Sequence, residues 1–235
     1  MRTLNILSID LDWFNYWAEG GSVSETRRAV ERCFYTVIDH CYLPNKLAWM
    51  QEHQYLYPWV LRLLRSRQAK QVNVVNIDEH HDFYRVGSVK DFKKHHVSCA
   101  DFFGFMVFDG ILNGYEWVNN GMTHSNRMGR RDVVWECERC QNPTVAAWGN
   151  QNARRLHVWD RNRLVKAIEG RIFDGVAIIE SPYYTRKLGT IRKQAQKILQ
   201  EEGFEVKTHQ CKTDFLYSKR KKVDMRPIFR AATMA

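Results

Sequence analysis

Three short apolar segments, each followed at once by an acidic residue, place the strongest constraint on how this chain can fold. The segments are residues 4–9, 72–77 and 175–179, and the acids that follow them are Asp10, Asp78 and Glu180. Continuous runs of this kind are typical of strands that are buried on both faces of a parallel sheet. In open α/β folds, ligands bind at the carboxyl ends of such strands. The sequence therefore predicts an α/β protein with a carboxylate-rich site along one edge of its sheet.

The stretches between these strands have the periodicity of amphipathic helices. Ser22 and Glu25 resemble a capping box, a common start of a helix. Helices are predicted at about 22–41, 55–68, 98–108, 160–170 and 185–202, and further strands at 155–159 and, as an edge strand, 204–208. Strands and helices in alternation predict a three-layer α/β/α sandwich with a mainly parallel sheet.

Residues 110–150 fit this alternation less well. They are rich in Asn, Gly, Arg and Trp, which favours a loop-rich insertion, with long loops or a small hairpin that could contact a substrate. Within it, Cys137 and Cys140 have the spacing of metal ligands, but a zinc site would have to recruit His124 or His157. We interpret the two cysteines instead as an exposed, reduced pair in a hairpin.

Length and composition limit the class of protein. A chain of 235 residues that is 44% hydrophobic and 26% charged suits one globular domain, which we assign to residues 1–218. No run approaches the ~20 apolar residues of a membrane span, so we expect a cytoplasmic protein without a membrane partner. The net charge of +10, to which a basic tail at residues 219–235 contributes, favours an anionic partner, either nucleic acid or an acidic peptide. A solvated basic surface is the simpler alternative.

An Asp-x-His-x-Asp motif directly follows the strand predicted at 72–77. Its members are Asp78, His80 and Asp82, and an extended segment would point all three to one side. Two carboxylates and an imidazole suit a divalent ion such as Mn²⁺, Fe²⁺ or Zn²⁺. A polar turn that caps the strand is the alternative for this motif alone.

A second acidic pair, Asp10 and Asp12, follows the strand predicted at 4–9. Two ionised groups at the end of a buried strand cost several kcal/mol unless they are paired or bind a metal. His53 lies just before the helix that precedes the Asp78 strand, so we expect it at the same edge of the sheet. It joins the candidate metal ligands, although a lone histidine beside aromatic residues is often only a packed side chain.

Together, the Asp-x-His-x-Asp motif at 78–82, the Asp-x-Asp motif at 10–12 and the upstream His53 resemble the ureohydrolase superfamily, which includes arginases and agmatinases. Enzymes of the histone-deacetylase type share its fold. Arginases carry Asp-x-Asp after Asp-x-His-x-Asp, whereas here the order is reversed. With Trp13 and Phe14 beside Asp12, the chain looks most like the peptide arginases, which convert arginine to ornithine in ribosomally made precursor peptides.

This resemblance implies a set of roles. It implies two Mn²⁺ ions, bridged by Asp78 and Asp10, with His53 and Asp82 completing one site and His80 and Asp12 the other. It further implies that Glu180, in Glu-x-Pro, pairs with the substrate guanidinium, and that His95 or His96 shuttles a proton; Asp82 is a third candidate for the acid. The implied reaction is the hydrolysis of an arginine guanidinium to ornithine and urea, on an arginine-containing precursor peptide.

Three other classes remain open from the sequence. A metal-dependent phosphoesterase or nuclease also uses Asp and His at strand ends, although no Gly-Asp or Gly-Asn-His signature is obvious here. A deacylase with one metal would leave Asp12 and His53 without a role. A basic nucleic-acid-binding module would leave the acids at the strand ends unexplained, because they repel phosphate. Nucleic acid is therefore the less favoured partner.

Overall fold

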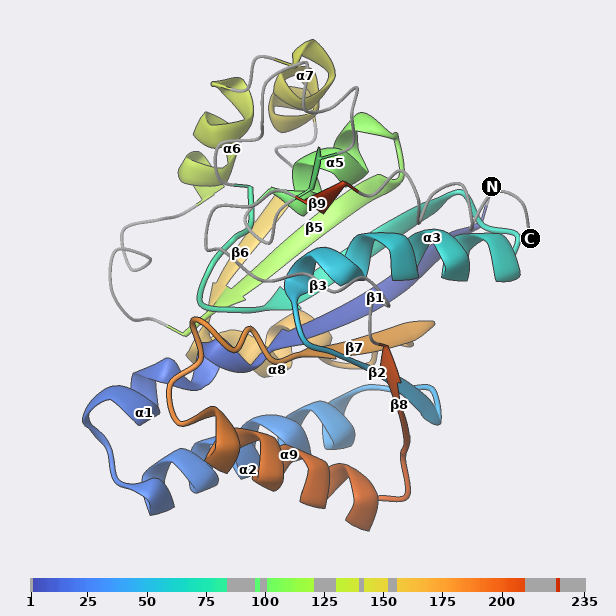
Figure 1. Cartoon of the computed structure of the whole chain (residues 1–235). Helices are drawn as coiled ribbons and strands as arrows, with labels where there is room; N and C mark the ends of the chain where they lie inside the picture. The colour runs from blue at the N-terminus through green and yellow to red at the C-terminus, as the bar shows by residue number, and fades with distance from the viewer. Residues whose placement is uncertain are drawn as a thin grey trace.

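Seven parallel strands form a single sheet in the order β6-β5-β3-β1-β7-β2-β8 (Figure 1). This computed structural model describes residues 2–83, 96–97, 101–120, 130–139, 142–151, 156–209 and 223–224. The strands are β1 (Thr3–Asp10), β2 (Lys46–Met50), β3 (Gln71–Ile77), β5 (Leu112–Asn119), β6 (Leu156–Asp160), β7 (Gly175–Ile179) and β8 (Glu205–His209). The predicted α/β class is confirmed, and the sheet is parallel throughout.

Helices cover both faces of this sheet and give the predicted three layers (Figure 1). One face packs against α2 (Val23–His40), α8 (Leu164–Ile168) and α9 (Leu188–Glu201). The other face packs against α3 (Leu56–Ser66), α5 (Phe102–Phe108), α6 (Arg130–Glu138) and α7 (Pro143–Gln151). A short 3-10 turn, η1 (Leu11–Phe14), and helix α1 (Asn15–Gly20) follow β1, while η2 (His53–Tyr55) precedes α3 and η5 (Arg161–Arg163) precedes α8.

Helix α2 begins where the sequence predicts it. The Ser22 hydroxyl accepts a hydrogen bond from the Glu25 backbone, and the Glu25 carboxylate accepts one from the Ser22 backbone, so the capping box is complete. Val30, Phe34 and Val37 lie along the buried stripe of the helix. Other helix boundaries differ from the prediction by a few residues, as for α9, which begins at Leu188 rather than near 185.

The prediction of loops or a hairpin at residues 110–150 is wrong for the described part of this stretch, which excludes residues 121–129 and 140–141. Strand β5 lies inside the sheet between β3 and β6, and α6 and α7 follow it. Tyr115 and Trp117 of β5 are fully buried, while the polar Asn113 and Glu116 bond to side chains from neighbouring parts of the sheet. The composition misled us because the buried residues of β5 are aromatic and its polar residues are paired within the fold.

Strand β2 and residue Cys137 are two further differences from the prediction. No strand is predicted from the sequence at Lys46–Met50, yet β2 pairs with both β7 and β8 and ends shortly before His53. Cys137 is not exposed in a hairpin: it is buried in α6, where its Cβ lies 2.6 Å from the position that a Cβ on Gly149 of α7 would take. Cys140 lies outside the described residues.

Part of the predicted tail takes part in a second, two-stranded sheet. Residues Val223–Asp224 form β9, which pairs in antiparallel fashion with β4 (His96–Val97). The rest of residues 219–235 lies outside the described part of the chain.

The strand order explains how the acidic residues meet. Strand β1 lies between β3 and β7, so Asp10, Asp78 and Glu180 follow three neighbouring strands. Ile9 is opposite Ile77, and Asp10 is opposite Ile179, so these strands end almost level with one another. The fold therefore collects the three acids at one edge of the sheet, as the sequence predicts.

Candidate metal centre

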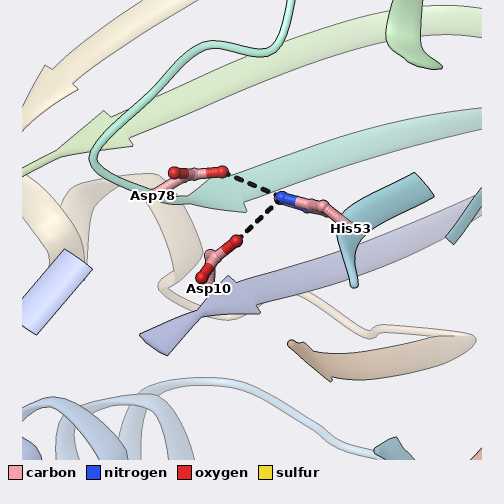
Figure 2. A group of neighbouring side chains, drawn as sticks. All are labelled: Asp10, His53 and Asp78. Atoms are coloured by element: carbon pink, nitrogen blue, oxygen red, sulfur yellow. Dashed lines mark ion pairs between the residues drawn. The ribbon is translucent and has the colours of Figure 1, made fainter. Parts of the chain in front are cut away.

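His53 meets two carboxylates from neighbouring strands at the centre of this edge (Figure 2). Its Nδ1 atom lies 3.0 Å from Oδ2 of Asp10 and 3.2 Å from Oδ2 of Asp78. All three side chains are buried. Asp10 ends β1, Asp78 follows β3, and His53 begins η2, which two residues separate from the end of β2, so three separate elements build the group.

Asp82 adds a third carboxylate around the same nitrogen. Its Oδ2 atom lies 2.9 Å from Nδ1 of His53, and within the described part of the chain this buried oxygen has no other partner. One ring nitrogen has a single proton or a single lone pair, so it cannot satisfy three carboxylates together. The group of Asp10, Asp78 and Asp82 therefore has more negative charge than His53 can neutralise, which suits a bound cation.

A second group overlaps the first at Asp78. It consists of Asp12, Asp78 and His80, whose potential ligand atoms all lie within 4.8 Å of one another. The Nδ1 atom of His80 is 3.1 Å from Oδ2 of Asp12 and 4.0 Å from Oδ1 of Asp78. Asp78 thus directs one oxygen towards each histidine, the arrangement expected of a residue that bridges two ions.

Surrounding groups fix the orientation of these side chains. The backbone N–H of Asp12 donates to Asp10 Oδ1, and that of His80 donates to Asp78 Oδ1. Asn76 donates to Asp78 Oδ2, and the Ser8 hydroxyl lies 3.0 Å from Nε2 of His53. If Nδ1 of His53 binds a metal, its Nε2–H can donate to Ser8, the kind of outer contact that orients histidine ligands.

The segment that contains the Asp-x-His-x-Asp motif is not extended, contrary to the prediction. It bends after β3, and Asp82 has a left-handed backbone with φ of 52°. The bend turns His81 inward, where its ring lies 5.5 Å from that of Trp117. The Trp117 indole donates to the Asp78 carbonyl and the Tyr115 hydroxyl to that of His81, so β5 holds the bend in place.

Burial and mutual repulsion change the pKa values at this site. Burial, then Asp82 and Asp10, raise the pKa of Asp78 to about 7. Burial, then Asp10 and Asp78, raise the pKa of Asp12 well above its ordinary value. Burial alone would lower the pKa of His80, but Asp12, Asp78 and Asp82 raise it to about 10. These carboxylates resist ionising together, and a divalent cation would remove that resistance.

Glu52 also belongs to this region and is not among the site residues predicted from the sequence. Its side chain is buried, and its Oε2 atom has no hydrogen-bond partner among the residues that the structure describes. Burial first, then Asp10 and Glu180, raise the pKa of Glu52 to about 7, although His53 lowers it. Its position directly before His53 was the signal that could have identified it.

Glu180 has two protein partners at this edge. Its Oε1 accepts a hydrogen bond from the Trp49 indole at 2.6 Å, and its Oε2 lies 2.5 Å from the Arg192 guanidinium. The predicted role of Glu180 in binding a substrate guanidinium stays a prediction. The predicted proton shuttles are not placed: His95 lies outside the described residues, and of His96 only its backbone pairing in β4 is described.

Comparisons with protein-family models, with curated proteins and with solved structures found no match to this chain. Within the described residues, no helix combines the length and the apolar character that crossing a membrane requires. The chain is thus a parallel α/β protein with a buried cluster of Asp and His residues in two overlapping groups that could hold metal ions.

Proposed function

We propose that this chain is a metal-dependent hydrolase of the ureohydrolase type, which converts arginine side chains of a peptide to ornithine and urea. The observation that carries the proposal is the pair of metal-binding groups that share Asp78. Hydrolases that act on poor electrophiles often use two metal ions about 3.5–4 Å apart. A shared carboxylate between two Asp/His groups is the arrangement that such a pair requires.

The donor set fits manganese. Four carboxylates, from Asp10, Asp12, Asp78 and Asp82, and two imidazoles, from His53 and His80, provide mainly oxygen ligands with some nitrogen. Ligands of this kind favour Mn²⁺ over metals that prefer sulfur. When bound, two such ions would supply the activation of water that hydrolysis of a guanidinium needs at neutral pH.

The chain's own residues would position the substrate and move protons. The Glu180 carboxylate contacts the guanidinium of Arg192, the same chemical group that the substrate carries, which supports a role for Glu180 in orienting the substrate. Asp82, His95 and His96 are the candidates for the acid that protonates the departing amine. His80, whose side chain is 39% exposed, opens the site towards solvent.

Two features support a peptide rather than free arginine as the substrate. Tyr183 and Tyr184 are exposed, and the Tyr184 ring lies 6.2 Å from that of His80, at the open side of the site. Exposed aromatic side chains beside a site favour contact with a larger ligand. The net charge of +10 favours a ligand with acidic residues.

Mass spectrometry of an arginine-containing peptide incubated with the Mn²⁺-loaded protein tests this function. We expect a loss of about 42 Da per converted arginine, together with released urea, because hydrolysis removes the guanidinium carbon and two nitrogens as urea. The Asp78→Asn variant is the control for contaminating activity. Release of urea from free L-arginine alone would contradict the peptide substrate. Removal of acetyl groups from an acetyl-lysine peptide, without urea release, would contradict the reaction itself.

A further inference from the structure

A cavity of about 530 Å³ lies between the helices on one face of the sheet. Residues from η1, α1, α2, η5 and α8 line it, among them Trp13, Trp17, Arg28, Arg32 and Arg161. Trp13 directly follows Asp12, so the cavity and the candidate metal centre share one short segment of chain. The cavity does not include the metal-binding groups themselves and calls for a separate explanation.

The lining of this cavity is positively charged. Three arginines face a single carboxylate, that of Glu25. Glu25 already accepts hydrogen bonds from the backbone and the hydroxyl of Ser22, as part of the capping box of α2. The hydrogen bonds from Ser22 and, to a smaller extent, the charge of Arg28 lower the pKa of Glu25. One acid thus serves both the helix end and Arg28, so the lining keeps a net positive charge from its three arginines.

Arg28 and Arg32 lie one turn apart on α2. Both are exposed, and neither forms a hydrogen bond or an ion pair with another residue in the part of the chain that the structure describes. Like charges at this spacing repel each other and weaken a helix. A pair of this kind beside a hollow suits an anion that binds between the two guanidinium groups.

Arg161, unlike these two, is held in a fixed position. Its guanidinium lies 3.9 Å from the centre of the Tyr16 ring and 5.6 Å from that of Trp17. It also donates a hydrogen bond of 3.4 Å to the carbonyl of Asn120. The same Asn120 donates through its side chain to the carbonyl of Trp13. Arg161 is thus a preorganised cation tied to the segment that carries Asp12.

We infer that this cavity binds the carboxylate of an acidic side chain, Asp or Glu, in the substrate peptide, with Arg28, Arg32 and Arg161 as its partners. The inference rests on the proposed function, because it names a recognition site for that substrate. Arginine forms paired hydrogen bonds with carboxylates, and Trp13 and Trp17 provide apolar surface for the stem of the side chain. An acidic residue near the target arginine would then place that arginine at the metal centre.

Isothermal titration calorimetry with two matched peptides tests this inference without relying on turnover. The peptides are identical, contain one arginine, and differ only in Glu or Gln at a neighbouring position. We expect the full-length protein to bind the Glu peptide about 10-fold more tightly, since charged hydrogen bonds exceed neutral ones. In the double variant Arg28→Ala/Arg32→Ala this preference should disappear. Circular dichroism would confirm that the variant is folded.

The matched control removes two positive charges elsewhere on the same helical layer. Arg27 and Lys193 line a separate hollow between α2 and α9, so the Arg27→Ala/Lys193→Ala variant should keep the preference for the Glu peptide. Equal loss of preference in both variants would overturn the site and leave only general attraction to a basic protein. An absent preference in the wild type would overturn it as well.

Further measurements distinguish a peptide carboxylate from other anions. They also separate failure of this inference from failure of the proposed function. Inorganic phosphate or a random oligonucleotide that binds through Arg28 and Arg32, while the Glu peptide does not, would overturn the inference of a peptide carboxylate. Because the titration measures binding alone, a protein that prefers the Glu peptide but releases no urea would contradict the proposed reaction and support the cavity. Urea release that does not depend on the acidic residue would support the proposed reaction and contradict the cavity as a recognition site.

Discussion

Asp10 and Asp78 lie at the ends of two adjacent parallel strands, and their Oδ2 atoms approach the same nitrogen of His53 at 3.0 and 3.2 Å. Both carboxylates are almost completely buried. Such proximity is unfavourable for two anions in a poorly solvated site unless a cation lies between them. This relationship ties the fold to the proposed chemistry, because strand pairing alone brings the two residues together.

Substituting the shared carboxylate should remove more metal than substituting an unshared one. We expect Asp78→Asn to lose binding at both groups, because Asp78 belongs to both, whereas Asp12→Asn should keep the ion at the group of Asp10, His53 and Asp78. Activity of Asp78→Asn should fall by more than the roughly 10–100-fold loss that is typical of outer-contact variants. Elemental analysis of the dialysed proteins measures the ions per chain. Equal metal content in the two variants would contradict the bridging role.

Removing the outer contact of His53 should weaken metal binding without destroying the site. The Ser8 hydroxyl lies 3.0 Å from His53 Nε2, and Ser8→Ala should lower the metal affinity by about 10–100-fold. Competition with a fluorescent chelator measures this affinity. Ser66→Ala is the control, since among the described residues Ser66 bonds only to the backbone carbonyl of Leu63 at the end of α3. An unchanged affinity in Ser8→Ala would show that Ser8 does not orient the ligand.

Above about pH 6.5 the metal-free protein should lose stability as the pH rises. Below that pH the buried His81, whose pKa burial lowers to about 3, opposes the trend. Asp78 and Glu52 have folded pKa values of about 7, above their ordinary values, so the folded state binds more protons than the unfolded state between about pH 4 and 7. The raised pKa of His80, about 10, adds stability that is present below about pH 6.5 and lost towards pH 10. Asp78, Glu52 and His80 therefore all make the folded state less stable as the pH rises.

Manganese should reverse this trend, because metals bind deprotonated carboxylates and neutral imidazoles. We expect the rise in unfolding temperature on adding Mn²⁺ to grow from pH 5 to pH 8. Thermal unfolding followed by circular dichroism, with and without a chelator, measures both trends. A metal-induced shift that is equal at all pH values would count against buried carboxylates as ligands.

Gly175 should tolerate no side chain at the start of β7. A Cβ there would lie 2.7 Å from the Trp59 ring and 2.8 Å from the Leu63 side chain of α3, so Gly175→Ala should destabilise the protein by about 1–3 kcal/mol. Gly189 in α9 has open space around it, and Gly189→Ala should be neutral or stabilise the protein by up to about 1 kcal/mol. Urea unfolding compares the two variants. Equal effects would contradict the tight packing of α3 against β7.

The sequence predicted the strands that carry the acids because most of their residues are apolar. Residues 72–77 and 175–179 have few polar side chains to obscure the pattern, and the acids directly after them mark where each strand ends. The convergence of Asp10 and Asp78 then followed from one general property of parallel sheets, that carboxyl ends share an edge. His53 followed from its position between two predicted elements.

Elements that depend on long-range partners escaped the prediction. The polar residues of β5 are stable inside the sheet because Asn113 bonds to Asn73, and Glu116 pairs with Arg171 and Trp159. None of these partners is near in sequence, so composition alone indicates a loop. The bend at Asp82 and the pairing of Glu180 with Arg192 depend likewise on contacts that exist only in the assembled fold.

Two cations should bind between these groups, and anomalous diffraction from manganese-soaked crystals would locate them. We expect two anomalous peaks about 3.5–4 Å apart, one contacted by Asp10, His53 and Asp78 and the other by Asp12, Asp78 and His80. The absence of any peak at saturating manganese, or a peak that touches none of these residues, would contradict this expectation.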